Sequence, residues 1–360
     1  MEEFQLNTKI VSGPGAIGVL GREKARRVFL VTDPFFVKNG MADRVVRAAG
    51  AENWEIFDGV QPDPSVELAA RGTARLKAFG PDLLIALGGG SAMDCAKAMA
   101  YFSGTDAPLA AIPTTSGSGS EVTDFAVLTH GQTKYPLVER RLQPALAILD
   151  SDLLDELPPG LIADTGFDVL THALEAYTAS NAGTIPDLLA QDAFRTAFAC
   201  LPASYAGDRS VRLRLHMAST LAGIAFSRSG LGLCHAMAHV LGGRFHIPHG
   251  RLNAILLPAV ISGNAPAAQA KYARLARAAG LGGSADTVAL RNLKNGLIRL
   301  RKDLGLPQTL SQAGAPPAQV WAATGEIVEA VLADPCCKTN PVPVEDYLVR
   351  RVLEEVTGNF

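Results

Sequence analysis

Short apolar runs alternate with helical segments over the first 115 residues, and this alternation restricts the possible folds more than any other feature. The apolar runs are 27–32, 54–60, 81–90 and 109–115, and the helical segments are 40–50, the stretch after Ser65, and 91–102. Strands that alternate with helices are typical of a parallel sheet covered by helices on both faces. We therefore predict an α/β fold for this part of the chain, with Ser65 as a helix N-cap.

The sequence changes in character beyond about residue 155, where the segments become long, rich in Ala and Leu, and helical in spacing. We expect helices at 164–179, 186–200, 210–227, 233–242, 252–262, 266–280 and 286–304. A chain of 360 residues also exceeds what one hydrophobic core usually covers. We predict an N-terminal α/β dinucleotide-binding domain at 1–155 and an all-helical C-terminal domain at 156–360, joined by a linker with paired prolines.

Composition excludes several classes of protein. The formal net charge is −2, which argues against a nucleic-acid partner. No apolar stretch is long enough to span a bilayer, and the acidic start MEEFQ does not resemble a secretory signal. The five cysteines match no zinc-ribbon spacing, so we expect reduced thiols and a cytoplasmic protein.

A glycine loop, Gly88–Ser91, lies between the third predicted strand and the helix that follows. Glycines let a backbone approach a ligand closely, and a helix start offers free N–H groups to a pyrophosphate. We place Asp94 in the first turn of this helix. A plain strand-to-helix turn is the alternative, because the dinucleotide pattern GxGxxG is absent.

A second loop, 114–120 (TTSGSGS), follows the fourth predicted strand. Hydroxyls and bare backbone N–H groups are the donors of a phosphate cradle. A flexible linker is the alternative, although strand-like segments flank the loop closely. Two such loops at the carboxyl ends of strands fit a ligand crevice in an open α/β sheet.

Asp33 ends the first predicted strand. A carboxylate there could accept hydrogen bonds from ribose hydroxyls and repel a 2′-phosphate, which favours NAD over NADP. The sequence Asp33-Pro34 equally fits a simple turn. From the residues alone, both interpretations stay open.

Four of the seven histidines fall within fifteen positions, in the segment 235–249. His235 and His239 are four apart on a helical segment and share a face, and His249 follows a Gly-Gly break and a proline. Asp168 and His172 are also four apart in a helical segment. Several imidazoles with a carboxylate suit Zn²⁺ or Fe²⁺. We expect His130 and His216 to be ordinary core histidines.

Several ordered motifs carry a resemblance to a known family. GGGSAMDCAKA, IPTTSGSGSEVT, GFDVLTHALEAY and GLGLCHAMAHVLGGRFHIPHG resemble the group III, iron-containing alcohol dehydrogenases, which share the architecture of dehydroquinate synthase. The resemblance extends from about residue 4 to about residue 350. It implies a catalytic metal, Fe²⁺ or Zn²⁺, held by Asp168, His172, His235 and His249. It also implies that His239 lies near the nicotinamide. We take this histidine as the candidate for relaying a proton, with a structural or stacking role as the alternative.

The same resemblance implies how NAD(H) would bind. Gly89, Gly90 and Ser91 would contact the pyrophosphate. Thr114, Thr115 and Ser118 of the second loop, together with Thr123 just after it, would line the rest of the dinucleotide. Asp33 matches the position that disfavours NADP, and Arg251 departs from the small or apolar residue of many relatives.

The activity implied by the resemblance is the interconversion of short-chain primary alcohols and aldehydes. Hydride would pass between substrate and nicotinamide while the metal activates the alcohol oxygen. The chain looks most similar to propanol and ethanol dehydrogenases of propanediol and ethanolamine utilisation, so a microcompartment location is considered, although no clear targeting helix is present. A homodimer, or a higher homo-oligomer, is expected.

Three alternatives remain at this point. A zinc polyol dehydrogenase of the glycerol type shares the architecture, but it normally uses one aspartate and two histidines. A lyase of the dehydroquinate synthase type also uses NAD and a metal. A non-enzymatic shell- or partner-binding protein would be expected to carry a damaged metal site.

Overall fold

A computed structural model describes residues 2–131 and 133–358. The chain divides into two compact units. One comprises Gln5–Leu157, and the other comprises Pro158–Phe360 together with the N-terminal segment that ends at Phe4. The predicted boundary, after residue 155, lies two residues before this division. The first unit is an α/β structure and the second is helical, which confirms the predicted fold class.

A six-stranded sheet in the order β1-β8-β5-β4-β2-β3 forms the centre of the α/β unit. All its neighbouring strands are parallel. Its strands are β1 (Lys9–Ser12), β2 (Arg27–Val31), β3 (Asn53–Phe57), β4 (Leu83–Gly88), β5 (Leu109–Pro113) and β8 (Leu146–Leu149). Its helices are α1 (Pro34–Lys38), α2 (Met41–Ala49), α3 (Val66–Phe79) and α4 (Gly90–Ser103).

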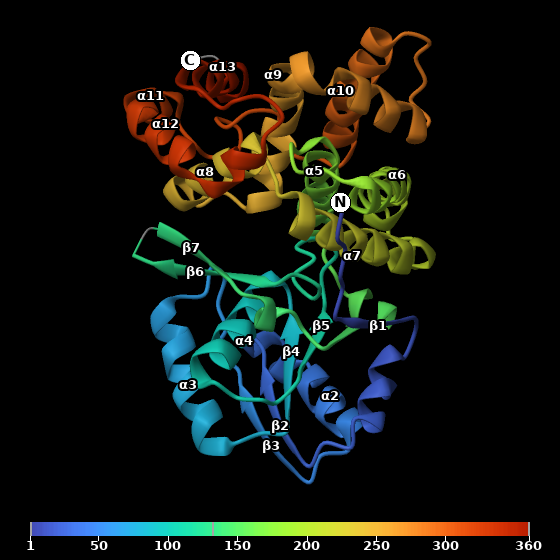
Figure 1. Cartoon of the computed structure of the whole chain (residues 1–360), viewed down its shortest axis with the longest axis vertical. Helices are drawn as coiled ribbons and strands as arrows, with labels where there is room; N and C mark the ends of the chain where they lie inside the picture. Colours follow the sequence, from blue (N-terminus) through green and yellow to red (C-terminus); the bar gives the residue numbers. More distant parts are fainter. Residues whose placement is uncertain (1, 132, 359–360) are drawn as a thin grey trace. The chain divides into compact units, whose positions relative to one another are not determined.

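Helices cover both faces of this sheet, as the alternation of elements predicts. Successive side chains of a strand point to opposite faces. Val28 and Leu30 of β2 therefore pack with α2 on one face, whereas Phe29 and Val31 pack with α3 and α4 on the other. Figure 1 shows α3 and α4 on one side of the strands and α2 on the other. As predicted, Ser65 begins α3, because its hydroxyl accepts a hydrogen bond from the backbone N–H of Leu68.

The order of the strands sets the position of a ligand crevice. From β2 the chain continues to β3 at one edge, whereas from β4 it continues to β5 on the opposite side. The adjacent strands β2 and β4 therefore form the switch point where an open α/β sheet binds ligands at its carboxyl ends. Asp33 follows β2, the glycine loop follows β4, and Thr114 follows β5. The fold thus gathers the predicted cofactor residues at one edge of the sheet.

Three parts of this unit were missed by the sequence analysis. Strands β1 (KIVS) and β8 (LAIL) are only four residues long, and although β8 is entirely apolar, both are shorter than the runs that we assigned as strands. The hairpin of β6 (Phe125–His130) and β7 (Thr133–Val138) is antiparallel and separate from the main sheet. β6 begins with an apolar run, FAVL, but β7 mixes polar and apolar residues, so the sequence does not show that the two strands pair.

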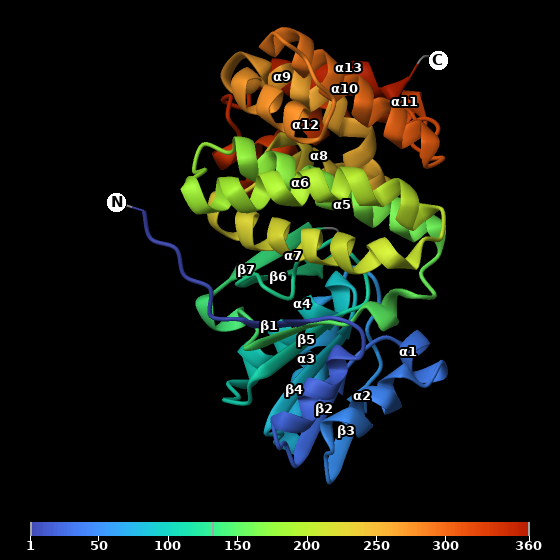
Figure 2. The same ribbon diagram turned by 90° about the vertical axis from the view of Figure 1, so that its right-hand side faces the viewer.

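The second unit is helical, as predicted (Figure 2). Helices α5 (Pro159–Thr178), α6 (Thr184–Tyr205) and α7 (Arg212–Ser229) pack alongside one another. The remaining α-helices are α8 (Leu233–Phe245), α9 (His249–Ala278), α10 (Asp286–Asp303), α11 (Pro317–Ala322), α12 (Thr324–Ala333) and α13 (Asp346–Thr357). Within the described part of the chain, none of the helices has the length and apolar character needed to cross a membrane.

Helix α9 is one continuous element, although we predicted two segments at 252–262 and 266–280. Pro258 and Pro266 lie inside it. A proline removes the N–H that would bond the carbonyl four residues earlier. At Pro258 this carbonyl belongs to Ala254, and Arg301 of α10 donates to it instead, at 3.0 Å. Tertiary contact therefore replaces the lost helical bond, which the sequence pattern does not reveal.

Candidate metal centre and cofactor loops

One face of α5 carries three functional side chains. Asp168, His172 and Glu175 occupy positions i, i+4 and i+7, a spacing that aligns side chains along one side of a helix. All three are buried. The sequence analysis singled out the first two and missed Glu175, although the same spacing could have identified it.

The structure brings Asp168, His235 and His249 together from three different helices. One ligand atom of each lies within 4.8 Å of the other two. The Asp168 Oδ1 atom is 3.7 Å from Nε2 of His235 and 3.6 Å from Nε2 of His249. These separations are longer than hydrogen bonds. They are close to the roughly 3.3 Å that separates two donors on one tetrahedral ion, so the donor set fits a divalent cation.

His172 lies beside this group of three and is not one of its members. Its Nδ1 is 3.8 Å from Oδ1 of Asp168. Its ring stacks between two others, with centroids 4.4 Å from both His235 and Phe226. The imidazole thus lies near the same carboxylate oxygen as the other two histidines, but the mutual spacing of 4.8 Å or less holds only for Asp168, His235 and His249.

Glu175 fixes the orientation of His235. Its Oε2 is 2.6 Å from Nδ1 of that ring, which leaves Nε2 pointing toward Asp168. The same carboxylate accepts backbone N–H bonds from Gly232 at 2.9 Å and Cys234 at 2.7 Å. These N–H groups belong to the start of α8, where unpaired donors and the helix dipole favour an anion. A carboxylate behind a metal-binding histidine is a common arrangement that also sets its tautomer.

The electrostatics of the cluster favour a cation. Burial by itself raises the pKa of Asp168, but His172 and the other histidines lower it overall, so the group is a carboxylate. Burial lowers the pKa of His235, yet the carboxylate of Asp168 beside the ring and that of Glu175, which is hydrogen-bonded to it, outweigh burial and raise the pKa to about 9. Burial and the neighbouring histidines hold the pKa of His249 well below its usual range. Asp168 and His249 therefore carry the protonation states that a metal requires, whereas His235 has to release a proton when a metal binds.

A close helix crossing places His249 in the cluster. A Cβ atom at Gly250 would lie 1.9 Å from the backbone oxygen of Asp164, so only glycine allows α9 to approach α5 here. Next to it, Arg251 donates to both carboxylate oxygens of Asp164, at 3.1 and 2.9 Å. Arg251, which departs from the family pattern, therefore joins α9 to α5 one turn before Asp168.

His239 adjoins the cluster without belonging to it. Its Nδ1 lies 2.9 Å from Oδ2 of Asp334, and its ring stacks on His249 with centroids 5.3 Å apart. Burial raises the pKa of Asp334, but the hydrogen bond from His239 outweighs it and lowers the pKa overall. The sequence analysis missed Asp334, which lies 95 residues from His239 and follows no spacing rule.

The other histidines play no part in this cluster. His246 is exposed and ends α8 in a left-handed conformation, with φ of 54°. His216 is buried, as expected. The expectation for His130 was wrong, because its side chain is 65% exposed and pairs with Glu67 on the surface. All five cysteines are unpaired thiols.

In the α/β unit the two predicted cofactor loops contact each other. A Cβ atom at Gly89 would lie 3.3 Å from the Thr115 hydroxyl, and one at Gly90 would lie 3.1 Å from Cβ of Ser118. Gly89 is the N-cap of α4 and, as a glycine, has no side chain that could accept hydrogen bonds from the first N–H groups of the helix. Together with Ser91 these partly exposed residues form a cradle suited to a pyrophosphate.

A buried lysine anchors the second loop. Lys97 is fully buried, and its Nζ donates to the hydroxyls of Ser120 and Thr123 at 3.0 and 2.9 Å and to the carbonyl of Phe125 at 2.8 Å. Burial lowers its pKa to about 8, against the opposing effect of Asp94. Thr123 and Thr114 are both buried, so they support the loop from inside.

Asp94 lies outside the first turn of α4, which corrects our expectation. Helix α4 begins at Gly90, so Asp94 is its fifth residue, and the first turn contains no acidic residue. Its two oxygens accept hydrogen bonds from the Ser120 hydroxyl at 2.7 Å and from the backbone of Val127 at 3.1 Å. Asp94 therefore holds the loop in place.

Both interpretations of Asp33 are compatible with its position. Its Oδ1 accepts a bond from the backbone N–H of Phe35 at 2.8 Å and so caps α1. Its Oδ2 faces the glycine loop, 3.8 Å from where a Cβ of Gly88 would stand. One oxygen thus makes the turn while the other remains beside the cofactor cradle.

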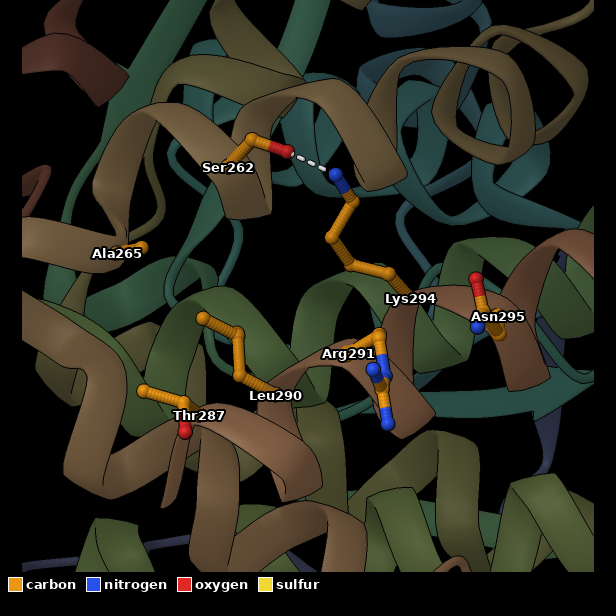
Figure 3. Close-up of a pocket in the computed structure, with 7 residues that line it drawn as sticks. All are labelled: Ser262, Ala265, Thr287, Leu290, Arg291, Lys294 and Asn295. Atoms are coloured by element: carbon orange, nitrogen blue, oxygen red, sulfur yellow. Dashed lines mark hydrogen bonds between the residues drawn. The ribbon is translucent and has the colours of Figure 1, made fainter. Parts of the chain in front are cut away.

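A separate pocket of about 330 Å³ lies between α9 and α10 (Figure 3). It is far from the metal cluster, because Ser262 follows His249 by thirteen residues, or about 20 Å along the helix. Lys294 donates to the Ser262 hydroxyl, while Arg291 points away from it. The charged groups of Lys294 and Arg291 do not point to one place, so the pocket does not have the arrangement of an anion-binding site.

Models of one protein family match both units of the chain. The model described as "Iron-containing alcohol dehydrogenase" matches residues 7–151. The model described as "Fe-containing alcohol dehydrogenase family, C-terminal" matches residues 162–357. The two matches follow each other along the chain and together cover nearly all of it.

Individual relatives agree with these matches. The chain is 41% identical to the 1-propanol dehydrogenase PduQ of Citrobacter freundii, over 99% of this chain and 100% of the relative. It is 37% identical to an NADPH-dependent butanol dehydrogenase of Clostridium saccharobutylicum, over 98% and 97% of the two chains. A sulfoacetaldehyde reductase from Bifidobacterium kashiwanohense, solved in complex with NAD⁺, superposes with a TM-score of 0.90 at 26% identity and covers both chains completely.

Proposed function

This chain belongs to the iron-containing alcohol dehydrogenase family, and on that premise we propose that it interconverts short-chain primary alcohols and aldehydes with NAD(H). One observation carries the proposal for the site. A single carboxylate oxygen, Oδ1 of Asp168, lies 3.6–3.8 Å from nitrogens of three histidines. This separation suits donors that share one cation.

We assign Asp168, His172, His235 and His249 as the ligands of Fe²⁺ or Zn²⁺. Such an ion, when bound, acts as a Lewis acid that lowers the pKa of an alcohol and polarises an aldehyde carbonyl. Asp168 and His172 project from one helix, while His235 and His249 come from α8 and α9. Glu175 behind His235 keeps Nε2 of that ring directed inward.

His239 is assigned to proton transfer. The carboxylate of Asp334 accepts the Nδ1–H of this ring, which leaves Nε2 as the nitrogen that can take or give a proton. Its side chain is 28% exposed, so it has access to solvent as well as to the edge of the cluster. A histidine in this setting can pass the hydroxyl proton of an alcohol to water.

We assign NAD(H) to the cradle formed by Gly89, Gly90 and Ser91 with the loop from Thr114 to Thr123. The relatives themselves differ, because one is named for NADPH and another is bound to NAD⁺. The free oxygen of Asp33 would repel the 2′-phosphate of NADP. Replacing Asp33 by Gly should therefore lower the KM for NADPH and raise the KM for NADH, and unchanged KM values would contradict this role.

The physiological substrate is proposed to be a propanol-like alcohol, following the name of the 41% identical relative. The test is anaerobic purification with metal analysis, followed by rates for a panel of alcohols and aldehydes with NADH and NADPH. Stoichiometric NADH oxidation with short aldehydes supports the proposal, and turnover of glycerol alone would contradict it. His249→Ala should lose both bound metal and activity, so retained metal content would overturn the ligand assignment.

The proposal also includes a homodimer and a cytoplasmic location. Five unpaired cysteines fit a reducing compartment. Light scattering of the purified protein tests the dimer, and fractionation of the native host tests the location.

A further inference from the structure

A second group of potential metal ligands lies beside the first. His239, Asp334 and Cys336 each offer one ligand atom, and these atoms all lie within 4.8 Å of one another. His239 comes from α8, while Asp334 and Cys336 flank Pro335 at the start of the 3₁₀ helix Pro335–Thr339. The proposed reaction uses His239 and Asp334 but has no role for the thiol.

The local backbone directs Cys336, and not its neighbour, into this group. The carboxylate of Asp334 caps the 3₁₀ helix by accepting the backbone N–H of Cys336 at 2.8 Å, through Oδ1. Its Oδ2 faces His239. The thiol of Cys337 instead donates to the carbonyl of Val331 at 3.1 Å. Two adjacent cysteines therefore point to different places, and only one completes the cluster.

We propose that His239, Asp334 and Cys336 form a second divalent-cation site, suited to a thiophilic ion such as Zn²⁺. Imidazole, carboxylate and thiolate are the three donor types that proteins use for Zn²⁺. Partial exposure of all three residues leaves room for a water as the fourth ligand. Nδ1 of His239 and Oδ2 of Asp334, now 2.9 Å apart, would separate by about half an ångström to share an ion.

Charge compensation favours two cations in neighbouring sites. The first cluster offers the carboxylate of Asp168 and, behind His235, that of Glu175. The second offers the carboxylate of Asp334 and the sulfur of Cys336. Metal binding converts the thiol to a thiolate and releases one proton to solvent, while the imidazole keeps one proton on its other nitrogen. Each dication thus meets two negative charges.

Occupation of the second site would inhibit the enzyme. A cation bound to His239 and Asp334 withdraws that histidine from proton exchange, so the step assigned to it slows. This consequence rests on the function proposed above, whereas binding itself does not. The second site is therefore tested by measuring metal binding directly, without using enzyme activity as the readout.

Cobalt distinguishes the two sites by their donor atoms. The first cluster contains only nitrogen and oxygen donors, so Co²⁺ bound there gives no thiolate-to-cobalt charge-transfer band. The second contains one thiol. Metal-depleted full-length protein is titrated with two equivalents of Co²⁺ while the near-ultraviolet spectrum is recorded, for the wild type and for two matched variants, Cys336→Ala and Cys337→Ala.

The wild type and Cys337→Ala should both develop the charge-transfer band, and Cys336→Ala should bind one equivalent without it. Asp334→Asn should weaken the binding that produces the band by more than about tenfold, since even outer partners of a metal ligand contribute that much. No band in the wild type, or a band that survives Cys336→Ala, would overturn the second site. If the first cluster does not bind metal, the protein would lack the equivalent of Co²⁺ that binds without a charge-transfer band, and this outcome is distinct from loss of the band.

Discussion

The carboxylate of Glu175 performs two tasks that are usually divided between residues. It accepts Nδ1–H of His235 and also the first backbone N–H groups of α8. The carboxylate and its N–H partners are buried. A side chain that presents an N–H in place of a carboxylate oxygen would therefore face another N–H, and an attractive contact would become a repulsive one. The orientation of a proposed ligand and the position of the helix that carries it thus depend on the same side chain.

Glu175→Gln should therefore weaken metal binding by about 10- to 100-fold, the usual effect of losing an outer partner of a metal-bound histidine. Competition with a chelator of known affinity measures the change. Glu121→Gln is the matched control, because Glu121 is also a buried glutamate but lies in the α/β unit. Equal metal affinities in Glu175→Gln and wild type would show that Glu175 does not position His235.

Lys97 gives a pH-dependent prediction. Its pKa is lowered to about 8 by burial, from 10.5 in an unfolded chain. Between these values the unfolded state binds more protons than the folded state, so stability rises with pH in this window. The gain from pH 8 to above pH 10 is on the order of 3 kcal/mol.

Lys97→Met removes this titration. Urea unfolding of both proteins from pH 7 to pH 10 should show the wild type gaining stability relative to the variant as the pH rises. Subtracting the variant cancels the titration of all other groups. A difference that stays constant over this range would mean that the folded protein does not depress the pKa of Lys97.

At the scale of elements, the crossing of α5 and α9 determines whether the metal cluster can form. Gly250→Ala would place a Cβ atom 1.9 Å from the backbone oxygen of Asp164, and no side-chain rotation can relieve a clash with backbone. We expect a loss of about 3 kcal/mol in the free energy of unfolding, at the upper end of overpacking effects. Metal affinity should fall as well, because His249 precedes the displaced residue.

Gly160→Ala is the control for this crossing. Gly160 lies in the first turn of the same α5, and a Cβ atom there meets nothing within 4 Å. Alanine in a helix is more favourable than glycine, so this variant should be as stable as the wild type or slightly more stable. Thermal unfolding of both variants measures the contrast, and equal effects would rule out the close approach as the cause.

The sequence predicted elements best where the local pattern and the tertiary structure agree. The apolar runs that became β2, β4 and β5 are buried on both faces, and buried strands have a strong sequence signal. We divided helix α9 just before Pro266, a residue type that normally ends or kinks a helix, whereas Pro258 lies inside the first predicted segment. At Pro258 the carbonyl that loses its helical partner accepts a hydrogen bond from Arg301, which lies 43 residues later in the chain, so no local pattern reveals this contact.

The same limit applies to the candidate site. Asp168, His172 and the segment 235–249 stand out because ligand residues recur at helical spacing. Asp334 contacts His239 across 95 residues, so no local pattern could connect them. The resemblance to a family supplied the full set of proposed ligands, whereas the residues alone left open which histidines bind.

At the scale of the whole molecule, the proposed chemistry is divided between the two units. Every proposed metal ligand lies in the helical unit, whereas the glycine loop and the threonine-serine loop lie in the α/β unit. A ligand that binds only the folded state stabilises the structure that holds it. Metal binding should therefore reduce local unfolding in the helical unit and leave local unfolding in the α/β unit unchanged.

Hydrogen exchange after anaerobic chelation tests this division. Removing the metal should speed exchange in α5, the start of α8 and the start of α9, because Asp168 would lose the cation that balances its charge and the histidines would lose a bonding partner. The strands β2, β4 and β5 should exchange at unchanged rates, since none of them supplies a ligand. Restoring Fe²⁺ or Zn²⁺ should reverse the change in the wild type but not in His249→Ala. Faster exchange across the sheet on chelation would instead show that the metal stabilises both units.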